Sequence, residues 1–365
     1  MLTRYDEFPC HQIVSTFNHV DTSAREWMER VIMHHHDMEG RFHLTCGIGW
    51  YPNRNVIDAF ACFAVEGKTQ YTVVASRELR PKIDVVEIGP FSYDIIEPLK
   101  KIRYSLGKNK YNLSYDLEFE ANMPCHEEEP QFSRSRGRVV ENVVRYDQTG
   151  RVGGWIKVGG KTYQVDKKNW LVERDHSWGI RRGGADMVET GVQPREYGLG
   201  TLYSWAAIQF PKWGACYHIR EEWDEKLDAP RIWHFSGGIF YPQESKKEEI
   251  KLDSIDHNFK VRPDNRRLES GHITLNGADG SKKEISLQAV GAVNLSRAGY
   301  GAFEGFIHGI WLGESFLDGV KLDLTDPNIA GELFWNTECK FKCGNQVGYG
   351  VVELLVVGKY PKYGF

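Results

Sequence analysis

Apolar and polar residues alternate along most of this chain. The clearest case runs from Tyr111 to Glu120, where Tyr, Leu, Tyr, Leu and Phe interleave with Asn, Ser, Asp, Glu and Glu. Because successive side chains of a β-strand point to opposite faces, this pattern predicts a strand with one buried and one solvated face. Further strands are predicted in the first half at Phe42–Trp50, Ile57–Val65, Gln70–Ser76, Phe91–Ile96, Ile102–Leu106, Val139–Tyr146, Trp155–Val158 and Thr162–Val165.

The alternation lapses between Arg181 and Gly200, where Gly, Pro and charged residues predominate, and this indicates a connection between two halves. Strand candidates on either side are too closely spaced for crossover helices, so we expect antiparallel sheets. The second half is predicted to hold strands at Tyr203–Phe210, Ala215–Arg220, Arg231–Tyr241, Phe259–Arg262, His272–Leu275, Ile285–Ala289, Phe303–Leu312, Glu332–Thr337 and Tyr349–Val357.

One segment has the period of a helix. Ser23 and Glu26 match a capping box, and apolar residues then recur on one helical face. These apolar residues are Trp27, Met28, Val31 and Ile32. The sequence therefore predicts an all-β protein with one short N-terminal helix, Ser23–His34. Its two domains, residues 1–185 and 186–365, are each expected to be an antiparallel barrel or curled sheet.

The composition supports sheet and excludes several classes of function. Aromatic residues make up 13% of the chain and glycines number 37, which favours pleated surfaces and tight turns. The net charge of −4 is spread without a basic block, so no nucleic-acid surface is expected. No apolar run approaches the roughly 20 residues of a membrane span, so we expect no stable membrane insertion. The N-terminus lacks an apolar signal core and the seven cysteines lack paired spacing, which favours a cytoplasmic protein with reduced thiols.

The sequence predicts neither a metal nor a cofactor. His34, His35 and His36 resemble a metal-binding tract, but consecutive histidines at a helix end point in different directions. A surface or C-cap role is preferred for them. Gly47-Ile-Gly49 lacks the context of a dinucleotide site, and neither a phosphate loop nor a nucleophile elbow is present.

The densest group of functional side chains is Arg174-Asp-His-Ser-Trp-Gly179. In a strand, Asp175 and Ser177 face one way while Arg174, His176 and Trp178 face the other. His176 and Trp178 then combine a titratable group with an aromatic wall, which suits the binding and protonation of an unsaturated hydrocarbon. Alternatively, Arg174 and Asp175 tie two sheets together and His176 is a hydrogen-bonded spacer.

This segment resembles the signature of the AttH-like and carotenoid 1,2-hydratase-like superfamily. Four further segments look like a bacterial branch of that group: Tyr51–Asp58, Ala75–Pro81, Gly348–Glu353 and Tyr360–Gly364. The resemblance implies two consecutive lipocalin-like domains. It also implies a hydratase, isomerase or cyclase activity, although the fold alone does not fix a function.

The resemblance also carries site residues. The His-x-Trp pair of the carotenoid hydratases is matched by His176 and Trp178. Their Tyr-x-Asp pair, in which the Asp protonates the alkene, corresponds here to Tyr203-Ser204-Trp205. The tyrosine matches, but an indole replaces the acid.

Another acid would have to replace the missing Asp. Asp175 is close in sequence but should point away from His176. Glu304 and Glu353 are lone carboxylates in apolar strands, which are either acids with a raised pKa or ion-pair partners of Arg174 or Arg181.

We therefore expect a cofactor-independent enzyme that hydrates, isomerises or cyclises a terpenoid, steroid-like or polyketide-like molecule. The alternative is a non-catalytic carrier of such a hydrophobic ligand. We expect one internal cavity lined by His176, Trp178, Tyr203 and Trp205. The predicted catalytic residues are His176, Tyr203, Glu304 and Asp175, and the predicted substrate-binding residues are Trp178, Trp205, Arg174 and Arg181.

Overall fold

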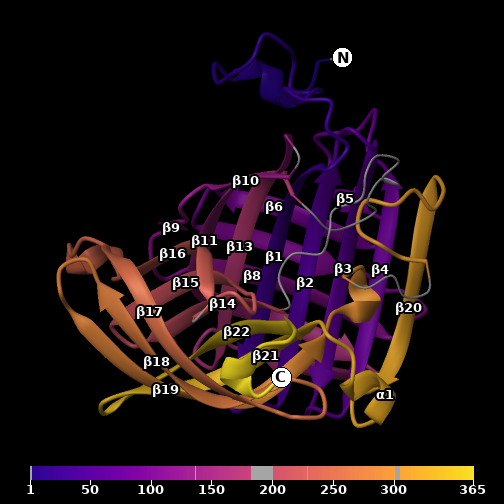
Figure 1. Ribbon diagram of the computed structural model, residues 1–365. Coiled ribbons are helices and arrows are strands. Elements are labelled where there is room, and N and C mark those ends of the chain that lie inside the picture. Colours follow the sequence, from indigo (N-terminus) through magenta and orange to yellow (C-terminus); the bar gives the residue numbers. More distant parts are fainter. Residues whose placement is uncertain (1, 136, 182–199, 228, 301–304) are drawn as a thin grey trace.

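The computed structural model describes residues 2–135, 137–181, 200–227, 229–300 and 305–365, and these residues form one large sheet and one closed barrel (Figure 1). All strand pairs are antiparallel. The 14-stranded sheet has the order β20-β4-β3-β2-β1-β13-β11-β8-β7-β6-β5, with β9, β10 and β12 paired to β11. The barrel follows the order β14-β15-β16-β17-β18-β19-β21-β22. The predicted all-β class with two antiparallel units is confirmed.

The strands of the sheet are β1 (Trp27–Asp37), β2 (Phe42–Tyr51), β3 (Val56–Val65), β4 (Thr69–Glu78), β5 (Glu87–Ile88), β6 (Phe91–Glu97), β7 (Lys101–Leu106), β8 (Leu113–Ala121), β9 (His126–Glu127), β10 (Gln131–Ser135), β11 (Arg138–Val158), β12 (Lys161–Val165), β13 (Trp170–Ile180) and β20 (Ser315–Asp323). Those of the barrel are β14 (Gly200–Phe210), β15 (Trp213–Trp223), β16 (Arg231–Phe240), β17 (Ile250–Val261), β18 (Leu268–Gly277), β19 (Lys282–Asn294), β21 (Trp335–Cys343) and β22 (Gln346–Gly358). The short helices are η1 (Arg4–Glu7), η2 (Gln243–Ser245), η3 (Ser296–Ala298), α1 (Pro327–Ala330) and η4 (Pro361–Tyr363).

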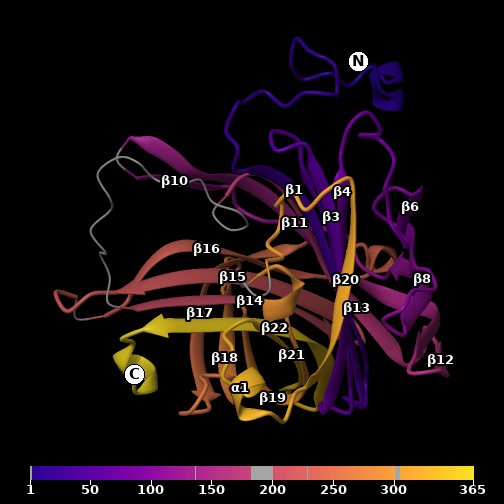
Figure 2. The same ribbon diagram turned by 90° about the vertical axis from the view of Figure 1, so that its right-hand side faces the viewer.

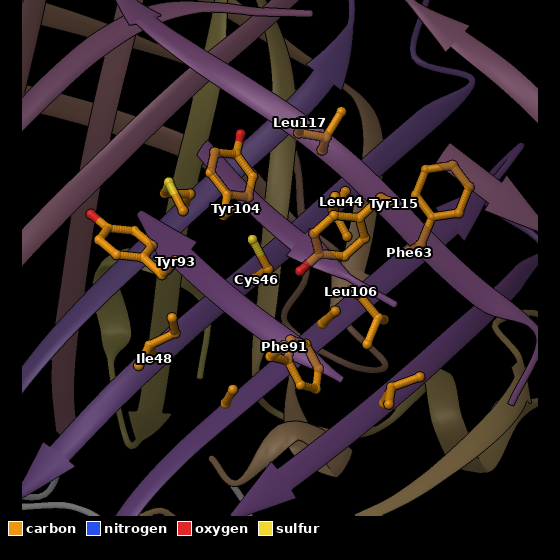
Figure 3. Close-up of a cluster of buried hydrophobic side chains, with 14 of the residues drawn as sticks. Leu44, Cys46, Ile48, Phe63, Phe91, Tyr93, Tyr104, Leu106, Tyr115 and Leu117 are labelled. Carbon is orange, nitrogen blue, oxygen red and sulfur yellow. The ribbon is translucent and has the colours of Figure 1, made fainter. Parts of the chain in front are cut away.

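The large sheet has two buried faces. Its inner face holds a core in which β2 and β3 face β6, β7 and β8, with Cys46, Tyr104 and Tyr115 at the centre (Figure 3). The barrel packs against the opposite face, here called the barrel face, through contacts of β14, β19 and β22 with β2, β3, β11 and β13 (Figure 2). A second core fills the barrel and includes Leu202, Tyr217 and Phe341. Apolar burial on both faces of the central strands therefore holds the two units together.

The helix predicted at Ser23–His34 is wrong. Residues Trp27–Asp37 form β1, which is paired with β2 on one side and β13 on the other. Because β1 is central and both of its faces are buried, apolar side chains such as Val31 and Ile32 occur in succession, and this spacing resembles one face of a helix.

The surface or C-cap role predicted for the histidines is also wrong. His34, His35 and His36 are fully buried on β1. His35 points to the inner face, where its ring contacts that of Tyr104, and the other two point to the barrel face.

A strand from the second half of the chain completes the first sheet. β20 pairs with β4 along its whole length, from Ser315 opposite Arg77 to Asp323 opposite Thr69, and Figure 1 shows it in orange at the edge of the sheet. The predicted domain boundary at 185/186 lies outside the described residues and stays a prediction. The strand predicted at Phe303–Leu312 is wrong for its described part, residues 305–312, which consists of turns and irregular chain.

Among the described residues there is no helix with the length and hydrophobicity that a membrane span requires.

Candidate active site

A cavity of about 190 Å³ lies between the barrel face of the sheet and the barrel. The sheet contributes Arg30, Arg145 and Asp175, and the barrel contributes Tyr203 and Glu353. The apolar part of the wall consists of Ile32, Leu295, Leu333, Phe334, Trp335, Leu354 and Leu355. An apolar wall with a few converging polar groups is typical of a site for a small organic molecule.

A carboxyl and a phenol meet at one side of this cavity. Tyr203 Oη donates a hydrogen bond of 3.0 Å to Glu353 Oε2. Burial raises the pKa of Glu353, the negative charge of Asp175 adds to this effect, and the hydrogen bond from Tyr203 opposes it. Burial also raises the pKa of Tyr203 well above its usual value. Glu353 is therefore shifted toward the protonated form that a general acid needs.

His34 does not supply a cation to Glu353. Its Nε2 lies 3.7 Å from Glu353 Oε1. Burial, together with the neighbouring histidines His35 and His36, lowers the pKa of His34 to about 3. A neutral imidazole stabilises a carboxylate far less than an imidazolium cation does. His34 therefore does not cancel the rise in the pKa of Glu353.

Arg145 is the charged centre of the neighbouring cluster. Its Nη1 lies 3.3 Å from Glu128 Oε1, and its Nε lies 3.9 Å from Asp175 Oδ1. Glu128 Oε2 is 3.0 Å from His218 Nδ1, and the His218 ring lies 5.1 Å from the ring of Tyr203. The Glu128–Arg145–Asp175 chain thus extends from the cavity wall into the protein.

One group of side chains resembles a metal site. Among the described residues, three side chains place atoms that could bind a metal within 4.8 Å of one another: Glu128, His218 and His234. Burial lowers the pKa of His218 to about 3 and that of His234 to about 4, and neutral imidazoles can bind metals. However, Arg145 already neutralises Glu128, and Arg220 Nε donates to His218 Nε2 at 3.1 Å. These two cations already bind one oxygen of Glu128 and one nitrogen of His218, and their positive charge opposes a metal ion at the same place, so we assign no metal to this cluster.

Two further arginines reach the cavity. Arg30 Nη2 donates to Tyr300 Oη at 2.8 Å and lies 3.0 Å from His308 Nε2. Arg181 Nη1 donates to Ser177 Oγ at 3.1 Å. The site therefore contains three guanidinium groups next to an apolar wall.

On the inner face of the same sheet lies a separate cluster around His176. Its Nδ1 is 2.9 Å from Tyr146 Oη and its Nε2 is 2.7 Å from Glu29 Oε1. The ring of Trp178 lies 5.5 Å from the His176 ring, and Trp178 is 39% exposed. Both ring nitrogens of His176 therefore already have partners at the edge of the inner core.

Arg174 also lies on the inner face, fully buried. Its Nε and Nη2 donate to Gln148 Oε1 at 3.0 and 2.6 Å. The guanidinium stacks over the rings of Phe119 and Tyr146, at 5.1 and 5.2 Å from their centroids. Its environment is that of a packed side chain.

The structure thus brings three of the predicted site residues together and separates three others from them. Asp175, Tyr203 and Arg181 line the cavity, whereas Arg174, His176 and Trp178 lie across the sheet from it. Trp205 is buried next to Tyr203, where its Nε1 donates to Asp147 Oδ1 at 3.2 Å and its ring contacts His34.

The expected single cavity of His176, Trp178, Tyr203 and Trp205 is therefore wrong, because the β13 side chains alternate and the barrel packs on the side of Asp175. Glu304 lies outside the described residues. The predicted catalytic and binding roles of all eight residues stay predictions.

Arg30 and Arg145 were not identified as site residues from the sequence. Each is a buried arginine next to two consecutive apolar residues, Val31 and Ile32 for Arg30 and Val143 and Val144 for Arg145, and that neighbourhood is the one signal that could have identified it.

The comparisons with known proteins support the fold. CghA has a TM-score of 0.51 and 8% sequence identity to this chain, with 91% of this chain and 88% of CghA covered. CghA with Sch210972 gives 0.50 and 8%, over 91% and 89%. Kievitone hydratase from Nectria haematococca gives 0.43 and 10%, over 90% and 88%, and is too distant to carry an argument.

No curated protein matches the sequence. The likeness to CghA shows a shared fold, and membership of the AttH-like and carotenoid 1,2-hydratase-like superfamily stays a prediction. One family model matches residues 2–365, and its description is a family of unknown function, DUF8625. Because the match spans almost the whole sequence, the chain belongs to the DUF8625 family.

Proposed function

We propose that this protein is a cofactor-independent hydratase, isomerase or cyclase that acts on a hydrophobic small molecule in the cavity between sheet and barrel. The observation that carries the proposal is the Glu353–Tyr203 pair, a carboxyl of raised pKa facing an apolar wall. A buried acid of this kind can protonate a carbon of the substrate, and the same group accepts a proton when ionised.

The proposed reaction needs this acid and no redox partner. Glu353 transfers its proton to one carbon of a double bond, so that its O–H bond breaks and a C–H bond forms. In a hydration, water adds to the other carbon and returns a proton to the Glu353 carboxylate. In an isomerisation, the carbon next to the cation loses its own proton to the Glu353 carboxylate, and a new double bond forms. In a cyclisation, a second double bond of the substrate first adds to the cation, and the new cation then loses a proton to the same carboxylate. Tyr203 stabilises the carboxylate between the two steps through its hydrogen bond.

The fold and the wall of the cavity support a terpenoid, steroid-like or polyketide-like substrate. Seven of the lining residues are apolar, including the aromatic Phe334 and Trp335. CghA, which shares the fold, has been solved with Sch210972. The alternative function, a carrier of the same molecule, would need the cavity but not an acid of raised pKa.

The test compares lipophiles that co-purify with the wild type and with Glu353→Gln from the same cells, identified by mass spectrometry. We expect the wild type to hold product and the variant to accumulate substrate. For a hydratase, substrate and product differ by the mass of one water molecule. For an isomerase or cyclase they have the same mass and differ only in chromatographic retention time. Glu284→Gln, at an exposed position on β19, is the control and should behave as the wild type. The same compound in all three proteins would refute the enzyme and support the carrier.

A further inference from the structure

The cavity carries more positive charge than its acids neutralise. Of its three arginines, Arg145 has Glu128 at 3.3 Å and Asp175 at 3.9 Å. Arg30 and Arg181 have no carboxylate within 4.0 Å among the residues that the structure describes, and their hydrogen-bond partners are hydroxyls and an imidazole. Two guanidinium groups at this cavity are therefore in contact with no carboxylate, although the more distant charges of Asp58 and Asp175 favour the charged form of Arg30.

His308, which accepts a hydrogen bond from Arg30, carries no charge of its own. Burial and the charge of Arg30 lower the pKa of His308 to about 4. Asp58 Oδ2 lies 3.3 Å from His308 Nδ1, so His308 carries its proton on Nδ1 and accepts from Arg30 through Nε2. Asp58 itself is held by the backbone N–H of Gly309 at 2.8 Å. This chain orients Arg30, which is 8% exposed, without placing a carboxylate on its guanidinium.

The excess charge is costly. Burial and the charges of Arg30 and Arg145 lower the pKa of Arg181, which shows that the site opposes a third cation. Glu353, whose pKa is raised by burial, balances this charge less than an ordinary carboxylate would. An uncompensated charge near an apolar wall is unfavourable unless an anion arrives with the ligand.

We infer that the ligand supplies this anion: the cavity binds a hydrophobic molecule with a carboxylate group. The carboxylate lies against Arg30 and Arg181, because guanidinium groups match its two oxygens in geometry and charge. The apolar body lies against Leu333, Phe334 and Trp335. The inference rests on the proposed function in its choice of cavity, and it restricts the substrate class to amphipathic acids.

The test uses two probes of equal chain length, octanoate and 1-octanol, with affinity measured by isothermal titration calorimetry on the whole protein. We expect the wild type to bind octanoate at least about tenfold more tightly than 1-octanol. Arg181→Gln should abolish this preference, and since Arg181 is partly exposed, the variant is expected to fold. Arg30→Gln should have the same effect. The control is Arg103→Gln, at an exposed arginine on β7 that pairs with Asp116, and it should keep the preference.

Octanoate that binds no more tightly than 1-octanol, or does not bind, would overturn the inference. A preference that survives Arg181→Gln would also do so, whether or not Arg30→Gln folds. A different result would refute the proposed enzymatic function. If the wild type prefers octanoate yet holds the same lipophile as Glu353→Gln, the anion site stands and the catalysis does not.

Discussion

The two faces of β13 place adjacent residues in unlike surroundings. On the barrel face, Asp175 borders a cavity with an acid of raised pKa and two guanidinium groups that no carboxylate contacts. On the inner face, His176 has both ring nitrogens paired, to Tyr146 and Glu29, and Trp178 is partly exposed. A cavity with converging acid and guanidinium groups marks the first face as a place for a ligand, whereas the hydrogen-bonded His176 marks the second as packing. Residues that are consecutive in a strand thus do not belong to one site.

The barrel face also carries the charged contact between the two units. His36 on β1 lies between Glu173 on β13, at 2.9 Å, and Glu338 on β21, at 3.3 Å. All three side chains are fully buried. Burial alone would lower the pKa of His36, but the charges of Glu173 and Glu338 outweigh it and raise the pKa well above 6.5. A protonated His36 therefore pairs with the Glu173 carboxylate and also contacts Glu338, whose own pKa burial raises to about 7.

The largest expected effect comes from removing this bridge. His36→Ala leaves the buried Glu173 carboxylate without its cation and Glu338 without its partner, and we expect a loss of about 3–5 kcal/mol in the free energy of unfolding. His176→Ala on the other face should cost about 1 kcal/mol or less, because His176 and Glu29 reach solvent. Urea denaturation of both variants measures the difference. Equal losses would mean that the barrel face is not the more tightly coupled one.

The second prediction concerns turnover. Glu353→Gln should slow the reaction by about 100-fold or more, the usual range for a general acid. His176→Gln should slow it by less than about tenfold, because its side chain lies across the sheet from the cavity. The ratio of substrate to product that co-purifies with each variant provides the measurement. Substrate accumulation in His176→Gln to the level of Glu353→Gln would move the reaction to the inner face.

The third prediction is a dependence of stability on pH. Burial raises the pKa of Glu338 from 4.5 to about 7, so the folded protein binds more protons than the unfolded chain between these values. Stability from this group therefore falls as pH rises from about 4.5 to 7. The raised pKa of His36 acts in the same direction, because its contribution is complete below about 6.5 and is lost as pH rises through its higher folded value.

Glu338→Gln isolates the first of these two groups. Buried neutral histidines such as His34 and His218 make both proteins more stable as the pH rises from 5 to 7, so the test is the difference between the two slopes. Relative to the wild type, the melting temperature of Glu338→Gln should increase from pH 5 to pH 7. Thermal unfolding followed by circular dichroism at both pH values makes the comparison. A variant with the same slope as the wild type would show that Glu338 does not titrate in this window.

The sequence predicted the half-solvated strands and also several strands with two buried faces, such as β2 and β3. The alternation from Tyr111 to Glu120 corresponds to β8, at Leu113–Ala121. β1 is the exception, because a capping-box match precedes it and its apolar residues, Val31 and Ile32 among them, have the spacing of one helical face. In the described part of Phe303–Leu312, Gly305 and Gly309 have φ of +81° and +73°, a conformation that does not continue a strand.

Only the part of the site that depends on local strand geometry could be predicted from the sequence. Strand alternation correctly separated Asp175 from His176. Which of the two faces meets the barrel depends on how the two units dock, and that involves contacts between residues far apart in sequence. Arg30, Arg145 and Glu353 come together from β1, β11 and β22, and no local pattern connects them.

The smallest expected effect is that of Trp178. Its ring is 39% exposed and contacts the rings of His176 and Tyr146 at 5.5 and 6.4 Å. Trp178→Ala should therefore cost about 1 kcal/mol in the free energy of unfolding, the scale of an aromatic contact at a wet site, and leave octanoate affinity unchanged. Trp205→Ala, the matched change on the barrel face, should cost several times as much, because Trp205 is 1% exposed and donates to Asp147. Urea denaturation of the two variants measures the free energies of unfolding, and calorimetry measures their octanoate affinities. Weakened octanoate binding in Trp178→Ala would place the ligand on the inner face.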